Sequence, residues 1–381
     1  MTTYLHAKAV SAPGSAIAPT RGALWLRRDK SWLSSLRKLM RFVSIFGASV
    51  LVSGSMAMAQ PASGQSFEAY VASLWPKAQA MGIRRSTFDR IVPTLTYNPR
   101  VVQLDRNQAD EVVVNPNAPI SPFAPYRARH VDSARIGGGQ AVLNRERAHL
   151  AEIERTSGVP AGVVLGIYGH ETNYGRITGD FDLLRSLSTL AYDGRRRALF
   201  EAEFLSAMLM VERGAPREAL IGSWAGAFGH PQFLPSVYLR MARDGDGDGV
   251  AAIWNNPSDA MASIAHYLQV SGYKRGERWG YAVSVPDALD RRSLASTSSS
   301  PRCARVFQRH SRFLTSAEWR ARGVSFRGTA PADDVLMSLI EPDGPGNTAY
   351  LLTGSYRAIL DYNCSNFYAL SVGLLADGIT Q

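Results

Sequence analysis

Cysteine is scarce in this chain, with only Cys303 and Cys364 among 381 residues. Neither has the histidine spacing that is typical of a zinc site. In an exported protein the pair would suit one disulfide, and two buried free thiols are the alternative. Both alternatives stay open from the sequence alone.

Strong compositional bias and a long hydrophobic run are also missing. The chain is 45% apolar and 19% charged, with 33 Gly and 20 Pro. These values are ordinary for a globular protein, and they exclude a disordered, collagen-like or coiled-coil chain. The length is sufficient for two or three domains, each with its own core.

Acidic residues are fewer than basic ones, and the formal net charge of +10 would suit a nucleic-acid-binding protein. The excess is unevenly distributed, however. Residues 1–59 hold eight Lys or Arg and one Asp, which leaves a balance of +3 for residues 60–381. We therefore predict no nucleic-acid partner.

The basic N-terminal segment has the pattern of a secretory signal. Arg37, Lys38 and Arg41 precede an apolar run over residues 42–52, and small residues follow up to Ala59. The pattern predicts cleavage after Ala59, with translation starting at Met1 or at Met40. The run is too short for a stable membrane span, so an N-terminal anchor is the less favoured alternative. Because this region has no Cys, we expect a soluble periplasmic protein that is not a lipoprotein.

Helical periodicity dominates the remainder of the chain. It predicts helices near residues 67–75, from about 132 to 156, from Pro160 onward, and at 356–362 and 366–377. Residues 97–125 are rich in Pro and Asn and are predicted to be irregular, and 296–301 to be a surface loop. Short alternating pieces at 281–285, 324–326 and 350–352 predict a small β region. We expect an N-terminal helical region at 60–155, a core at 156–276, a β-containing domain at 277–353 and C-terminal helices at 354–381.

A helix that begins at Pro160 places Val164, Ile167, Tyr168 and Glu171 on one apolar stripe. A carboxyl group in such surroundings loses hydration, which raises its pKa and suits a general acid. The alternative is a structural role for Glu171 at the end of the helix.

Five separated segments together resemble the B-type lytic murein transglycosylases. They are Gly-His-Glu171-Thr-Asn-Tyr-Gly; Gly222-Ser-Trp-Ala-Gly-Ala-Phe-Gly-His-Pro-Gln232-Phe-Leu-Pro-Ser236; Asp244-Gly-Asp-Gly-Asp-Gly249; Ile264-Ala-His-Tyr267-Leu; and Tyr362-Asn-Cys-Ser-Asn-Phe-Tyr368-Ala-Leu. The resemblance implies a mainly α (α+β) fold, with a goose-lysozyme-like helical catalytic core, an added helical N-terminal region and a small β-containing domain.

The same resemblance implies non-hydrolytic cleavage of peptidoglycan glycan strands, with Glu171 as acid and then base. The products would carry 1,6-anhydromuramic acid ends. Two alternatives stay open, namely a lysozyme-type hydrolase of the same fold and a catalytically silent peptidoglycan-binding protein. A hydrolase usually needs a second carboxylate. Asp180, Asp182 and Asp193 follow Glu171, but none lies in a motif that marks it as that second acid.

Substrate-binding residues also follow from the resemblance. They are Ser223, Gln232, Phe233, Tyr267, Tyr362, Asn363, Tyr368 and Tyr126. A purely core role for Tyr267 and an exposed, inactive Gln232 are the alternatives. We assign no catalytic role to His170 or His230. Other proteins of cell-wall synthesis or remodelling are expected as partners.

An acidic loop resembles the first half of an EF-hand, with carboxylates at Asp244, Asp246 and Asp248 and a Gly at 249. The twelfth position is Asn255 instead of Glu, and the resemblance places the last acidic ligand at Asp259. We expect a structural Ca²⁺ here and no cofactor for catalysis. The alternative is a flexible acidic turn without an ion.

Overall fold

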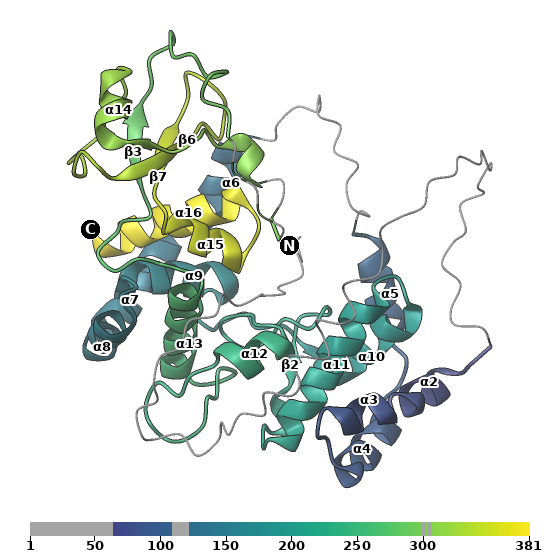
Figure 1. Cartoon of the computed structure of the whole chain (residues 1–381). Coiled ribbons are helices and arrows are strands. Elements are labelled where there is room, and N and C mark those ends of the chain that lie inside the picture. Colours follow the sequence, from purple (N-terminus) through teal and green to yellow (C-terminus); the bar gives the residue numbers. More distant parts are fainter. Residues whose placement is uncertain (1–63, 109–121, 297, 299, 301, 304–305) are drawn as a thin grey trace, which may run out of the picture. The chain divides into compact units, whose positions relative to one another are not determined.

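A computed structural model describes residues 64–108 and 122–381, apart from 297, 299, 301, 304 and 305 (Figure 1). The predicted signal, Met40, the cleavage point at Ala59 and part of the 296–301 loop lie outside the described residues. Within the described part, no helix has the length and apolar character needed to cross a membrane.

Most of the described elements are helices, as the sequence predicts. They are α2 (Phe67–Ser73), α3 (Trp75–Ala80), α4 (Arg85–Ile91), α5 (Pro99–Arg106), α6 (Phe123–His130), α7 (Ser133–Arg145), α8 (Arg147–Ser157), α9 (Ala161–Thr172), α10 (Leu183–Asp193), α11 (Arg197–Glu212), α12 (Pro235–Met241), α13 (Pro257–Val270), α14 (Ser316–Ala321), α15 (Tyr356–Tyr362) and α16 (Asn366–Thr380), with 3-10 turns at Val92–Thr94, Arg217–Ala219 and Val306–Arg309.

Helix α9 lies at the centre of this arrangement. Every residue from Gly162 to Gly169 is buried, because α7, α8, α13 and α16 all pack against it. The predicted single apolar stripe is therefore too narrow a description, since the helix is enclosed on all sides. Figure 1 shows α16, in yellow, lying alongside α9.

Glycines allow α9 and α16 to approach closely. A Cβ atom at Gly166 would lie 2.6 Å from the backbone oxygen of Val372, and one at Gly162 would lie 3.0 Å from that of Ala376. Neither backbone oxygen can move aside as a flexible side chain would. The small residues of α9 thus fix how α16 lies against it.

A five-stranded antiparallel sheet follows in the chain, with strand order β4-β6-β7-β3-β5. Its strands are β3 (Gly280–Ser284), β4 (Leu314–Thr315), β5 (Ser325–Phe326), β6 (Leu336–Ile340) and β7 (Ala349–Leu352). Buried Trp319 of α14 belongs to the apolar cluster of this region and donates its indole N–H to Met337 O, 2.9 Å away.

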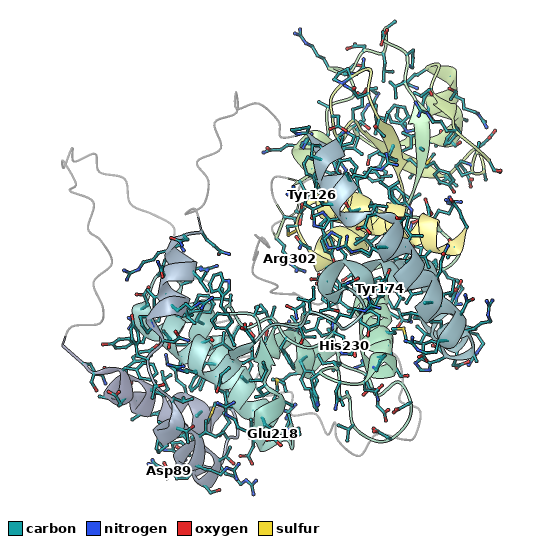
Figure 2. All side chains as sticks on the ribbon, turned by 180° about the vertical axis from the view of Figure 1, so that it is seen from behind. Asp89, Tyr126, Tyr174, Glu218, His230 and Arg302 are labelled. Atoms are coloured by element: carbon teal, nitrogen blue, oxygen red, sulfur yellow. A yellow bond between two sulfur atoms is a disulfide. The ribbon has the colours of Figure 1, made fainter. Side chains whose placement is uncertain are left out.

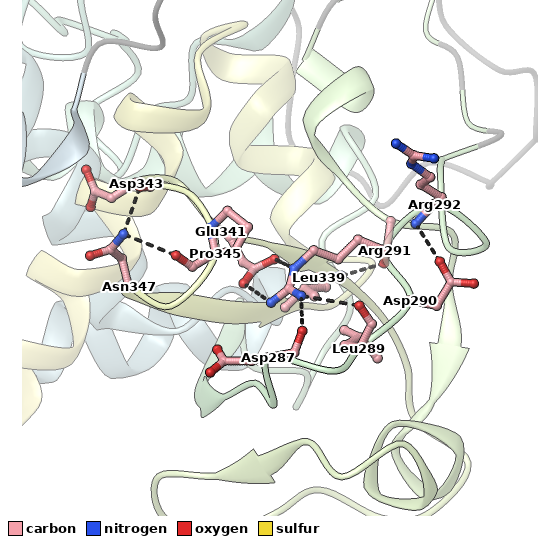
Figure 3. A network of polar contacts seen from close by, with 11 residues as sticks. Asp287, Leu289, Asp290, Arg291, Arg292, Leu339, Glu341, Asp343, Pro345 and Asn347 are labelled. Carbon is pink, nitrogen blue, oxygen red and sulfur yellow. Dashed lines mark hydrogen bonds and ion pairs between the residues drawn. The ribbon is translucent and has the colours of Figure 1, made fainter.

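An ion pair closes one side of the β region (Figure 3). The Arg291 guanidinium donates to both carboxylate oxygens of Glu341, at 2.7 and 2.9 Å, and also to the carbonyls of Asp287 and Leu289. This bidentate pair joins the segment after β3 to the end of β6. The neighbouring Asp343 accepts the backbone N–H of Phe123, which links this region to α6.

Three local predictions differ from the structure. The predicted helix over 132–156 is two helices, α7 and α8, because the chain breaks at Glu146. Part of the predicted irregular 97–125 segment is helix α5, capped by the Asn98 side chain. Strand β6 was not predicted, since buried Met337–Ile340 lacks the polar alternation of a half-buried strand.

A second sheet has two strands, both of which lie between α9 and α12 in the chain. It pairs β1 (Phe181–Asp182) with β2 (Ile221–Gly222). At Gly179, where φ is +97°, a Cβ atom would lie 2.2 Å from the Gly222 oxygen. The segment after α9 is therefore held directly against the loop that follows β2.

Candidate active site

Glu171 is the penultimate residue of α9 and is partly exposed. The helix ends in two successive left-handed residues, Asn173 (φ 49°) and Tyr174 (φ 61°). The Tyr174 ring then packs against glycines of α7 and α9, and a Cβ atom at Gly169 would lie 2.6 Å from it. The Tyr174 hydroxyl (Figure 2) donates to Arg135 O at 2.7 Å, which fixes the chain immediately after Glu171.

Tyr368 of α16 provides the direct partner of Glu171. Its hydroxyl donates to Glu171 Oε1 at 2.8 Å, across 197 residues of sequence. Burial and the nearby Glu171 charge raise the pKa of Tyr368 well above its usual value, and they have the same effect on Tyr362. They also raise the pKa of Tyr126 to about 12. All three phenols therefore stay protonated around Glu171 near neutral pH.

Ser223 and Gln232 organise the loop that follows β2. Ser223 Oγ accepts the N–H of Ala227 at 3.0 Å, while Gln232 Nε2 donates to Thr178 O at 3.1 Å and Gly229 O at 3.0 Å. Gln232 also has a left-handed backbone, with φ of 50°. Both side chains are partly exposed, and their hydrogen bonds help to fix the loop.

Sequence reasoning missed Thr172 as the link between this loop and the Glu171 motif. Its Oγ1 donates to His230 O at 3.0 Å and accepts the N–H of Gly175, also at 3.0 Å. The Tyr168 hydroxyl lies 3.0 Å from Nδ1 of the same histidine, and burial lowers the pKa of His230. The motif residues on both sides of Glu171 are therefore tied to the Gly222–Ser236 segment, and no local pattern signals this contact.

Phe233, Tyr267 and Tyr362 lie in the interior of the structure. All three were expected to contact the substrate, but each is completely buried. Their rings pack on one another at centroid distances of 4.8 to 5.9 Å. The hydroxyl of Tyr267 donates to Asp361 O at 2.7 Å, and that of Tyr362 to Pro231 O at 2.5 Å. In this conformation the three rings form a buried aromatic cluster, which agrees with the core alternative for Tyr267.

Two other expected substrate-binding residues are more accessible. Tyr126 of α6 is partly exposed, and its hydroxyl lies 3.4 Å from His170 Nε2 (Figure 2). Asn363 is also partly exposed and follows α15 in an extended conformation. Its Oδ1 atom is shielded from water and has no hydrogen-bond partner among the described residues. Such an acceptor costs about 1–3 kcal/mol until a donor reaches it.

Cys303 and Cys364 form a disulfide in the structure, with their Cα atoms 5.3 Å apart. Cys364 directly follows Asn363, and Arg302, which precedes Cys303, donates to the Tyr267 hydroxyl at 3.0 Å. The bridge therefore connects the segment after the β3 strand to the buried aromatic cluster.

Three of the four expected calcium ligands converge. One carboxylate oxygen from each of Asp244, Asp246 and Asp259 lies within 4.8 Å of the others. Asp248 is not part of this group, and its Oδ1 accepts the N–H of Val250 at 2.8 Å. Asp259 is fully buried, and burial together with the other two carboxylates raises its pKa. A buried carboxylate that faces two others suits a divalent cation with oxygen ligands.

Comparison with known proteins places these features in a family. The model for the transglycosylase SLT domain matches residues 66–377. The membrane-bound lytic murein transglycosylase B of Escherichia coli (strain K12) is 32% identical over 200 residues. That alignment covers 52% of this chain and 55% of the relative, so the chain spans about half the length of this curated protein.

Solved structures match over a longer range. SltB3 from Pseudomonas aeruginosa, in complex with NAG-NAM-pentapeptide, is 37% identical with a TM-score of 0.73. The match covers 83% of this chain and 80% of SltB3. Soluble lytic transglycosylase SltB1 from the same organism is 27% identical with a TM-score of 0.67, over 82% of this chain and 98% of its own. These matches confirm the predicted mainly α, lysozyme-like fold with a small β part.

The family model covers most of the described residues, including Glu171, Tyr368 and the loop that carries Ser223 and Gln232. The chain therefore belongs to the family of transglycosylase SLT domain proteins, as its five motifs predict.

Proposed function

We propose that this protein is a lytic transglycosylase of peptidoglycan. It would cleave the β-1,4 bond between N-acetylmuramic acid and N-acetylglucosamine without consuming water. Family membership supports the reaction class. SltB3, which is similar over most of its length, has been solved with NAG-NAM-pentapeptide and with NAG-anhNAM-pentapeptide.

The observation that carries the proposal is the position of the Glu171 carboxylate among protonated phenols. Glu171 accepts from Tyr368 and ends a helix that is buried along most of its length. Two of the acids that follow it are committed elsewhere. Asp182 caps α10 and binds Arg217, while Asp193 binds Arg106. This arrangement favours a one-carboxylate mechanism over the two-carboxylate mechanism of most hydrolases.

In this mechanism Glu171 acts twice. Its carboxylic acid first protonates the glycosidic oxygen, and the bond to the muramoyl anomeric carbon breaks. The resulting carboxylate then takes the proton of the muramoyl C6 hydroxyl as that oxygen bonds to the anomeric carbon. The proton count on Glu171 is restored, and the muramoyl end becomes a 1,6-anhydro ring. Tyr368 stabilises the charged intermediate form of Glu171 by donating to it.

Sugar recognition is assigned to residues that are partly exposed. Asn363 Oδ1 is an acceptor without a partner among the described residues, and it suits an N-acetyl N–H or a sugar hydroxyl. The partly exposed Tyr126 offers a ring face to a sugar. Ser223 and Gln232 fix the loop after β2. The Ser223 hydroxyl and the Gln232 amide are proposed to complete the contacts with the sugar.

We also propose that Asp244, Asp246 and Asp259 hold a structural Ca²⁺. The ion would neutralise three converging carboxylates and stabilise the loop before α13. No catalytic step is assigned to it.

Export to the periplasm is proposed from two observations. The N-terminal pattern is that of a cleaved signal, and the disulfide between Cys303 and Cys364 suits an oxidising compartment. Partners in cell-wall synthesis or remodelling belong to the same proposal. Cell fractionation with mass measurement of the mature N-terminus would test it, and an uncleaved chain in the cytoplasm would contradict it.

Mass spectrometry of the muropeptides released from purified peptidoglycan tests the reaction. We expect products lighter by one water than those of a hydrolase, and we expect Glu171→Gln to release none. Glu152→Gln is the matched control, because Glu152 lies exposed on α8 in an ion pair with Arg155. Products with reducing ends would identify a hydrolase, and the absence of products from the unmodified protein would identify a binding protein.

A further inference from the structure

Two histidines beside Glu171 are not used by the proposed reaction. His170 directly precedes Glu171 on α9, and His130 is the last residue of α6. Their rings are nearly parallel, with centroids 4.8 Å apart and an angle of 10° between the planes. Tyr126 stacks on His130 at 4.0 Å and 20°, so three rings from two helices form one stack.

This stack reaches the direct partner of Glu171. The His170 ring meets the Tyr368 ring edge to face, with centroids 4.5 Å apart and an angle of 63°. The Nε2 atom of His170 makes a second contact, because it lies 3.4 Å from the Tyr126 hydroxyl. His170 therefore contacts Tyr368, which donates to Glu171, and Tyr126, whose pKa is raised in part by the Glu171 charge. Since His170 and Glu171 are consecutive on one helix, their relative placement is fixed.

The charge state of the stack follows from its surroundings. Burial lowers the pKa of His170 to about 3. The Arg135 charge acts in the same direction, as does His130 when it is protonated. Burial lowers the pKa of His130 as well, and Arg135 and Arg129 act in the same direction, whereas the hydrogen bond to Tyr126 O and the nearby Asp132 act against it. Both rings are therefore neutral at pH 7.

A neutral imidazole suits a packing and hydrogen-bonding role next to a catalytic acid. Since the Tyr126 phenol stays protonated, it can donate to a ring nitrogen of neutral His170. His130 is held in turn through its Nδ1, which lies 2.8 Å from Tyr126 O. Each ring of the stack is thus fixed by a neighbour.

We propose that His170 is a positioning residue, which holds Tyr368 and Tyr126 in place around Glu171 through ring contact and its Nε2 atom. This inference rests on the proposed function, because its effect is read out as turnover of peptidoglycan. It assigns to Tyr126 a role in fixing the acid in addition to any contact with a sugar.

His170→Phe tests the proposal, since it keeps an aromatic ring and removes the nitrogen. We expect kcat to fall about tenfold with KM changed less than about twofold, because the loss affects the acid more than substrate binding. His170→Ala, which also removes the ring that meets Tyr368, should move the alkaline limb of the kcat profile to higher pH, because a displaced Tyr368 no longer stabilises the charged carboxylate. His149→Phe on α8 is the matched control, and we expect it to leave kcat and the profile unchanged.

Tyr126→Phe and the double variant show whether His170 acts through Tyr126. We expect the single change to lower kcat and the double variant to be no worse than His170→Phe. Tyr126→Phe alone keeps the proposal testable if His170→Phe does not fold, because a fall in kcat with an unchanged KM still supports it.

Several results would overturn the proposal. They are an unchanged kcat in a folded His170→Phe, an unchanged pH profile in a folded His170→Ala, fully additive losses in the double variant, or a Tyr126→Phe effect confined to KM. All of these presuppose turnover by the unmodified protein. If the unmodified protein released no anhydro products, the proposed function would fail instead, and the two failures are therefore distinguishable.

Discussion

At the residue scale, the Tyr368 phenol and the surroundings of Glu171 act in opposite directions on the acid. Partial burial would favour the neutral carboxylic acid, which the first step of the proposed mechanism requires. The hydrogen bond from Tyr368, 2.8 Å long, favours the carboxylate that the second step requires. This balance suits the proposed role of Glu171 as acid and then base.

Tyr368→Phe should therefore lower kcat by about 10- to 100-fold while leaving the fold intact, because it removes only the hydroxyl. The alkaline limb of the kcat profile should move to higher pH, since the charged form of Glu171 loses its donor. Steady-state rates between about pH 4 and pH 9, which span the ordinary pKa values of carboxyl and imidazole groups, would check this. Tyr192→Phe is the control, because the Tyr192 hydroxyl bonds to Gln65 O instead. An unchanged profile would contradict the assigned role.

Asp259 lets the calcium proposal be tested one side chain at a time. We expect millimolar Ca²⁺ to raise the melting temperature, because an ion at about 100 times its Kd adds about 2.7 kcal/mol to stability. Asp259→Asn should abolish that increase. Asp248→Asn should retain it, because Asp248 lies outside the group of converging carboxylates. Calorimetry provides the measurement, and equal loss in both variants would contradict the ligand assignment.

Residue identities at the site could be predicted from motifs, but their burial could not. Glu171 and Tyr368 are brought together as the motifs imply. Phe233, Tyr267 and Tyr362 belong to the same motifs, yet α13, α15 and the loop before α12 bury them against one another. That burial depends on contacts between distant segments, which no local pattern records.

At the element scale, the crossing of α9 and α16 depends on missing side chains. Gly166→Ala should destabilise the protein by about 1–3 kcal/mol, since the added Cβ would lie 2.6 Å from a backbone oxygen. Gly137→Ala on α7 is the matched control, because nothing lies within 4 Å of its Cβ position. It should instead stabilise by about 0.5–1 kcal/mol, as alanine favours helix. Denaturant unfolding would check both, and equal effects would contradict the close-approach argument.

Helices were more predictable than strands and breaks. Pro160 and the periodicity after it predict α9 well, and the two C-terminal helices begin where the pattern does. The break at Glu146 has no Pro or Gly to signal it, and it arises because α7 and α8 each pack separately against α9. Strand β6 was missed because it is buried between β4 and β7, in a sheet whose other strands come from later and earlier segments.

At the scale of the whole molecule, the disulfide ties together segments 61 residues apart. Changing both Cys303 and Cys364 to Ser should lower the free energy of unfolding by about 2–4 kcal/mol, because the unfolded chain gains the freedom of a long loop. Urea unfolding of this variant against the oxidised protein is the measurement. The reduced unmodified protein should match the variant, and a stability equal to that of the oxidised protein would contradict the prediction.

The 197-residue separation between Glu171 and Tyr368 also bears on the timing of synthesis. Helix α9 can only be enclosed after residues 366–380 have been translated, because α16 covers one of its sides. Long-range contacts of this kind form late in folding. A nascent chain that has emerged only as far as the β region therefore carries the acid without its phenol partner. If Glu171 acts as proposed, efficient cleavage would therefore begin only once α16 has docked against α9.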